Sequence, residues 1–137
     1  MKTKHLTIAE FNQFPFHDAE LHQFTVWRND DTVVLRASLK IGVIDDSYDV
    51  GYLYPQRAGT TQLVFLDCRI ILTDFKGGIK GGYDTIDDGN VNVNSDLIVK
   101  ACNWPPTDPK EFNHFQFKLH SGSIIDIVAK TAQFQLP

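Results

Sequence analysis

The sequence contains few cysteines, few glutamates and no long apolar run. Its two cysteines, Cys68 and Cys102, are too few for the disulfide scaffold of a small secreted protein. Each lies in an apolar stretch, which favours two buried free thiols, while a single bridge between them stays open. No apolar run approaches the roughly 20 residues that span a bilayer, so we expect no membrane partner.

Basic residues are also fewer than acidic ones. Lys and Arg number 13 against 17 Asp and Glu, which gives a net charge of −4. A domain that grips phosphate backbones is usually basic, so we expect no nucleic-acid partner. The charged N-terminus is not followed by the apolar segment of a signal peptide, and this predicts a cytoplasmic protein.

The composition indicates a mainly β protein. Of the 17 acidic residues, 14 are Asp and three are Glu, and Asp favours turns and caps over helix interiors. Val, Ile and Thr together number 31 and aromatic residues 16, and these side chains suit the pleated surface of a sheet. A chain of 137 residues is too short for two comfortable cores, so we expect a single domain over residues 1–137.

Periodicity along the chain predicts one short helix followed by strands. Thr7 and Glu10 form a capping box at the start of the helix, and Pro15 ends it. Apolar alternation predicts the strands, and the polar segment 84–94 is expected to be a turn. The expected strands span 20–28, 32–41, 48–54, 62–75, 97–104, 114–120 and 124–136, the last with an irregularity at Ile124 and Ile125. The fold class that follows is an antiparallel sandwich or open barrel of six to eight strands with one short N-terminal helix.

The densest polar cluster beside an apolar segment contains His17, Asp18 and His22. An imidazole oriented by a carboxylate can act as a general base, and the same residues can form a contact surface for a partner. The favoured interpretation is structural, with Asp18 capping a turn and His17 bonded to backbone. Residues 17 and 22 of an extended strand lie about 16 Å apart, at roughly 3.3 Å per residue, so no metal site is expected there.

Other motifs for metals and cofactors are incomplete. A calcium loop that begins at Asp84 places Ile86 and Ser95 where oxygen ligands and a bidentate Glu are needed, so we expect a solvated turn. An irregular calcium site from Asp87, Asp88 and Asn90 is the minor alternative. The sequence has neither a phosphate-binding P-loop nor a GxSxG serine motif, and no cofactor is expected.

Aromatic side chains provide the remaining candidates for binding. Tyr48, Tyr52 and Tyr54 fall on one face of an expected strand, where they either dock a sugar or peptide or form a wall of the core. Trp27 and Trp104 present the same two alternatives. Solvent exposure of the rings distinguishes docking from packing.

Two segments of the first half carry a family resemblance. Residues 16–21 read FHDAEL, an NDD turn follows at 29–31, and residues 63–68 read LVFLDC. The chain resembles small bacterial all-β proteins that open with an aromatic-His-Asp-Ala/Ser motif and carry an L-x-F-x-D strand. Most of these are uncharacterised, and some belong to immunity families of polymorphic toxin systems. The resemblance implies a cytoplasmic binding protein in which His17 and Asp18 are a structural signature and not catalysts.

These observations lead to one main functional hypothesis and two alternatives. The main hypothesis is a non-enzymatic protein-interaction domain, with toxin neutralisation as one form, because an acidic chain suits a basic partner. The first alternative is a small hydrolase or isomerase with its site around His17, Asp18 and His22. The second is a sugar- or peptide-binding sandwich that uses Tyr48, Tyr52 and Tyr54. Exposed strand edges also allow a homodimer.

Overall fold

The computed structural model describes residues 3–14, 16–17, 19–28, 35–42, 60–75, 84–93, 95–104 and 106–135. The strands of this part of the chain are β1 (Thr3–Leu6), β2 (Glu20–Arg28), β3 (Leu35–Gly42), β4 (Thr60–Cys68), β5 (Ile70–Asp74), β6 (Asp84–Asn92), β7 (Asn113–Leu119), β8 (Ile124–Ala129) and β9 (Thr131–Gln135). The helices are α1 (Ile8–Gln13), α2 (Asp96–Cys102) and the 3-10 helix η1 (Pro109–Glu111). The prediction of a mainly antiparallel β protein is confirmed. The described residues form nine strands, however, where six to eight were expected, and a second α-helix.

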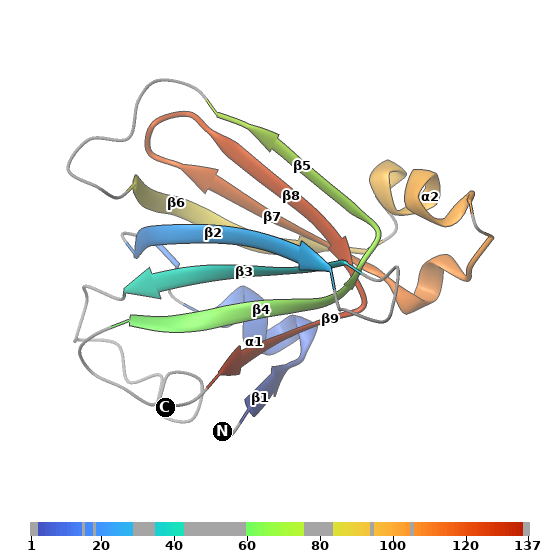
Figure 1. Ribbon diagram of the computed structural model, residues 1–137, viewed down its shortest axis with the longest axis horizontal. Helices are drawn as coiled ribbons and strands as arrows, with labels where there is room; N and C mark the ends of the chain where they lie inside the picture. Colours follow the sequence, from blue (N-terminus) through green and yellow to red (C-terminus); the bar gives the residue numbers. More distant parts are fainter. Residues whose placement is uncertain are drawn as a thin grey trace.

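All nine strands belong to one open sheet, in the order β1-β9-β4-β3-β2-β6-β7-β8-β5. The sheet folds over, so that β1, β9, β4, β3 and β2 form one layer, and β7, β8 and β5 lie in the other (Figure 1). Strand β6 joins the layers, because its first residues pair with β2 and the rest of the strand pairs with β7. The layer formed by β6, β7, β8 and β5 is called the second layer.

Two long runs that were expected to be single strands each divide into two. Residues 62–75 separate into β4 and β5, with a positive φ of 54° at Asp67. Residues 124–136 separate into β8 and β9 at Lys130, so the expected irregularity at Ile124 and Ile125 is misplaced. Each run stays rich in apolar residues across its break, so the pattern of apolar residues alone does not reveal where a strand changes layer.

The two breaks lie side by side and form a corner between the layers. The backbone N–H of Arg69 donates to the carbonyl oxygen of Val128 at 2.7 Å, and that of Lys130 donates to Leu66 at 3.0 Å. The two segments therefore turn from one layer into the other at the same level, and their backbone N–H and C=O groups form hydrogen bonds with each other.

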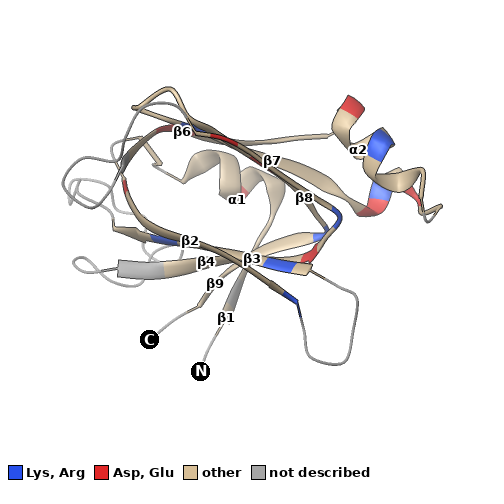
Figure 2. Ribbon diagram, turned by 45° about the horizontal axis from the view of Figure 1, so that its top comes forward, with Lys and Arg blue, Asp and Glu red and all other residues tan. Residues whose placement is uncertain are grey.

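Helix α1 lies between the layers (Figure 2). Its capping box is present as predicted, since the Glu10 N–H donates to the Thr7 hydroxyl and the Thr7 N–H donates to the Glu10 carboxylate, both at 3.1 Å. The apolar side of the helix enters a core that is rich in phenylalanines, which are Phe11, Phe14, Phe16, Phe65, Phe115, Phe117 and Phe134. This core holds the two layers and α1 together.

The prediction of a strand at 97–104 is wrong, because residues 96–102 form α2. Ser95 caps the helix by accepting from the Ile98 N–H at 3.2 Å, and the buried residues Ile98, Ala101 and Cys102 follow helical spacing. The β-branched residues Ile98 and Val99 suggested a strand, but capping and one-sided burial decide for a helix.

The prediction of a turn at 84–94 is also wrong, because residues 84–92 form β6. Ile86 and Val91 are buried in the core, while Asp88, Asn90 and Asn92 pair with β7 and face outward. The many Asp and Asn residues resemble a turn in composition, but they occupy the solvent side of a strand.

Candidate functional site

The segment Phe16–His17 is anchored in the core by its aromatic ring. Phe16 is buried and packs against Gly89 of β6, where a Cβ atom would lie 2.8 Å from the Phe16 ring and 3.0 Å from that of Phe117. Glycine is therefore required at position 89 by the close approach of two rings. Because Phe16 is held in this way, the position of His17 at the surface is defined.

His17 lies beside Asp87 and His120, two residues that are far from it in the sequence. The Nδ1 atom of His17 is 2.9 Å from the backbone oxygen of Asp87, so Nδ1 carries a hydrogen and donates it. The Asp87 carboxylate is 3.1 Å from Nδ1 of His120. Asp87 occupies the irregularity in the pairing of β6 with β7, and such a bulge redirects side chains. All three residues are exposed, so their electrostatic interaction is weakened by solvent.

His22 has a different partner from His17. Its Nε2 atom lies 3.0 Å from the carboxylate of Glu20 on the same strand, β2, which is irregular between Leu21 and Gln23. Asp18 lies outside the described residues. The grouping of His17, Asp18 and His22 as a catalytic site therefore stays a prediction.

The described residues contain no group of three or more His, Cys, Asp and Glu side chains that is suited to a metal ion. The minor calcium alternative involved Asp87, Asp88 and Asn90. The Asp87 carboxylate contacts His120, whereas Asp88 and Asn90 lie in a row with Asn92 on β6. The Asn90 amide donates to Asp88 at 2.9 Å, and the Asn92 amide donates to Asn90 at 3.1 Å. These side chains hydrogen-bond to one another along the strand.

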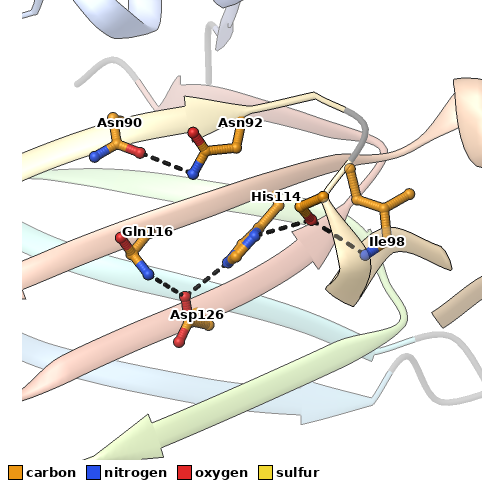
Figure 3. Close-up of polar contacts among 7 residues, drawn as sticks. Asn90, Asn92, Ile98, His114, Gln116 and Asp126 are labelled. Carbon is orange, nitrogen blue, oxygen red and sulfur yellow. Dashed lines mark hydrogen bonds and ion pairs between the residues drawn. The ribbon is translucent and has the colours of Figure 1, made fainter. Parts of the chain in front are cut away.

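A polar network that the sequence did not predict connects α2 to the second layer (Figure 3). His114 of β7 has its Nε2 atom 2.7 Å from the Asp126 carboxylate of β8 and its Nδ1 atom 3.0 Å from the Ser95 hydroxyl. The same Asp126 oxygen accepts from the Gln116 amide at 2.9 Å. Because an ionised carboxylate only accepts, Nε2 carries a hydrogen, and in the neutral ring Nδ1 accepts from Ser95.

The network has a structural role at the start of α2. Ser95, His114 and Asp126 lie in series like a proton relay, but the Ser95 oxygen is also the acceptor that caps Ile98. The histidine is buried, and its two contacts join the helix cap to two strands. We therefore interpret the network as a clamp that positions α2. The sequence offered one signal for it, the Ser-Asp pair before an apolar segment, which is typical of a helix start.

Helix α2 and the segment after it project beyond the ends of the strands (Figure 1, Figure 2). A small apolar cluster holds them against the second layer, and its buried members are Ile98, Ala101, Cys102, Phe112 and Val128. At the C-terminal end of α2, Trp104 is 85% exposed. For Trp104, the alternative of a core position is therefore wrong, whereas Trp27 is half-buried.

Tyr48, Tyr52 and Tyr54 lie outside the described residues, so their use in sugar or peptide binding stays a prediction. The two cysteines are free and buried, as the favoured interpretation of the sequence predicted. Burial raises the pKa of the Cys68 thiol to about 12. This thiol stays protonated at neutral pH and is unsuited to nucleophilic chemistry.

Comparisons with known proteins assign no family to the chain. No protein-family model matches it, and searches of curated proteins and of solved structures find no match either. Among the described residues, no helix has the length and apolar character needed to cross a lipid bilayer.

Proposed function

We propose that the protein is a non-enzymatic protein-binding domain and that Trp104 is the anchor of its binding surface. The observation that carries this proposal is the 85% exposure of a tryptophan on a projecting segment. Tryptophan is among the side chains most enriched at the energetic centres of protein interfaces. Val99 of α2, the helix that precedes Trp104, is also exposed and adds apolar area to the projection.

The described backbone on either side of Trp104, at 102–104 and 106–110, supports the proposal because it forms hydrogen bonds of its own. Asn103 and Pro106 form a β-bridge across the tryptophan, and the Thr107 N–H donates to the Cys102 carbonyl at 3.1 Å. Asp108 then caps η1 by accepting from the Lys110 N–H at 3.0 Å. A preorganised loop loses little conformational entropy on binding, which favours affinity.

The size of the expected effect follows from the area of the ring. Burying a tryptophan removes on the order of 200 Å² from water, which corresponds to about 5 kcal/mol at about 25 cal/mol per Å². The costs of association and of ordering the interface reduce this gain. We therefore expect truncation of Trp104 to cost about 2 kcal/mol, or about thirtyfold in affinity.

A narrower form of the proposal is neutralisation of a basic toxin in the cytoplasm. The net charge of −4 supports it, because opposite charge accelerates encounter between partners. If electrostatic steering contributes, the association rate will fall as salt concentration rises, while dissociation changes less. A salt-independent association rate would count against a basic partner and leave the Trp104 anchor intact.

The proposal is tested by comparing wild type with Trp104→Ala. Each protein is used to capture partners from a lysate of the native host, and the captured protein is then purified and titrated by calorimetry. We expect a protein that binds wild type directly and binds Trp104→Ala about thirtyfold more weakly. Equal affinity of the two proteins, or no specific partner, would argue against the proposal.

Val26→Ala is the matched control, because Val26 is also an exposed apolar residue, at 44%, and lies on β2. It should bind the partner within about threefold of wild type, as surface truncations away from an interface do. Trp104 fluorescence in a Trp27→Phe background provides a second readout. Its emission should shift to shorter wavelength when the partner covers the ring.

A further inference from the structure

We propose that the corner between the layers is a binding site for a phosphate group, formed by Arg69 and Lys130. A single residue separates β4 from β5, and a single residue separates β8 from β9. Both of these residues are basic, Arg69 in the first break and Lys130 in the second. Two positive charges therefore meet at one corner although their residues are far apart in the sequence.

Backbone hydrogen bonds fix the relative position of the two residues. Besides the two bonds that join the breaks, the Lys130 carbonyl oxygen accepts from the side-chain amide of Asn113 at 3.1 Å. Asn113 directly follows Phe112, so this bond ties the corner to the segment that carries the Phe112 ring. A site with such a backbone loses little conformational entropy when it takes up a ligand.

Both charged groups lie over one aromatic ring. The guanidinium carbon of Arg69 is 5.3 Å from the centroid of the Phe112 ring, and the Lys130 ammonium is 5.8 Å from the same centroid. The attraction of a cation to the face of an aromatic ring holds each group there. Because two like charges share one ring they repel each other, and an anion bound to both offsets that repulsion.

Neither charged group has an acidic partner in the part of the chain that the structure describes. The ion pairs among these residues involve other side chains, and two acidic residues nearby in the sequence, Asp67 and Glu111, form none. The side chains of Arg69 and Lys130 are half-buried, where a charge without a partner is unfavourable. Their N–H groups are therefore suited to donate to an anion.

The chemistry of the two groups favours phosphate among the anions. A guanidinium donates two parallel hydrogen bonds to phosphate oxygens, and an ammonium adds a compact positive charge. Together the groups carry two positive charges, which match the charge of a phosphate monoester or of inorganic phosphate near neutral pH. The net charge of −4 disfavours a long polyanion such as nucleic acid and leaves a small phosphate ligand.

The proposal is tested by titrating the protein with inorganic phosphate and following the backbone amides by NMR. The reference sample contains sodium chloride at the same ionic strength, which corrects for screening. We expect saturable shifts of the corner amides, at 66–70, 112–113 and 128–131, with a dissociation constant in the millimolar range. Acetate has one negative charge and should bind at least about tenfold more weakly.

A short, otherwise neutral phosphoserine peptide forms the second arm of the titration and distinguishes the source of the phosphate group. Tighter binding of the peptide than of inorganic phosphate would identify a phosphorylated protein as the source. Equal or weaker binding of the peptide would identify free phosphate. In either case the shifts should fall on the same amides.

The decisive variants are Arg69→Gln and Lys130→Gln, each of which removes one charge and should weaken phosphate binding about tenfold. Arg69→Lys keeps the charge over the ring but loses the parallel donors, and should weaken binding about threefold. Lys118→Gln is the matched control, because Lys118 is exposed and pairs with Ile124 at the end of β8 that is distant from the corner. It should bind phosphate as wild type does.

Three results would overturn the proposal. These are the absence of saturable shifts with phosphate, shifts that are not confined to the corner, and binding that neither Arg69→Gln nor Lys130→Gln weakens. Arg69→Lys keeps the test valid if loss of the charge disturbs the corner itself. Trp104→Ala should bind phosphate like wild type, so this site is tested independently of the protein-binding proposal.

Discussion

The two apolar clusters of this protein differ in what fills them and in what they hold. The cluster between the layers is rich in phenylalanine, and its rings contact one another from α1, β4, β7 and β9, with centroids 4.6–6.0 Å apart. The cluster beneath α2 has five buried residues, of which only Phe112 is aromatic. It is supplemented by the polar clamp of Ser95, His114 and Asp126.

This difference indicates which part of the molecule can unfold locally while the rest stays folded. Loss of contacts between the layers removes the core of the whole domain. Loss of contacts beneath α2 releases one helix and the segment that carries Trp104. Regions with few buried apolar contacts open at lower free energy than the global unfolding reaction.

The largest expected effect separates the two clusters directly. Phe117→Ala leaves a cavity among the rings of the main core and should lower the free energy of unfolding by about 3–5 kcal/mol. Phe112→Ala should lower it by roughly 1–2 kcal/mol, because the smaller cluster contributes less to global stability. Denaturant unfolding measures both values, and equal losses would show that the clusters are not separable in this way.

Hydrogen exchange sharpens the same comparison. In Phe112→Ala, exchange should accelerate over 96–112 while the amides of β3 and β4 keep wild-type rates. In Phe117→Ala, exchange should accelerate throughout the sheet, since global unfolding becomes easier.

A substitution of intermediate effect tests the aromatic contact behind His17. Gly89→Ala places a methyl group within 3.0 Å of the Phe16 and Phe117 rings, so the rings must move. Overpacking of this kind should cost about 1–3 kcal/mol. Gly122→Ala does not serve as a control, because φ there is 91°. A suitable control is Ala9→Gly on the exposed side of α1, which should cost about 1 kcal/mol through helix propensity alone.

The smallest effect distinguishes the two helix caps. Ser95→Ala removes the cap of α2 and the hydroxyl partner of His114, and should cost about 1 kcal/mol with faster exchange in α2. Thr7→Ala removes the cap of α1 at a similar cost, but α1 lies in the main core and its exchange should change less. If the two helices respond alike, the clamp does not set the stability of α2.

Much of the fold was predictable because its signals are local. The capping box of α1 involves residues three apart, and the apolar alternation in β3 and β7 places the apolar side chains of each strand on its core side. For α2, a Ser N-cap competed with β-branched residues, and tertiary packing beneath the helix decided the outcome.

The candidate sites were less predictable because they depend on register. Asp126 meets Gln116 and His114 only because β7 and β8 pair in one particular register. Likewise, His17 meets Asp87 through a contact between residues 70 positions apart. Nothing in the local sequence of either histidine specifies these partners. The exposure of Trp104 was one of two alternatives, and sequence alone did not choose between them.

The corner at Arg69 and Lys130 has a consequence for how the chain folds. Its two backbone bonds join residues that are about 60 positions apart, so a large loop must close before they form. Proteins dominated by such distant pairings fold on timescales of milliseconds to seconds. Until the corner closes, the position of the break between β4 and β5 is not fixed. The strands that have already formed are then exposed to misassociation with other chains.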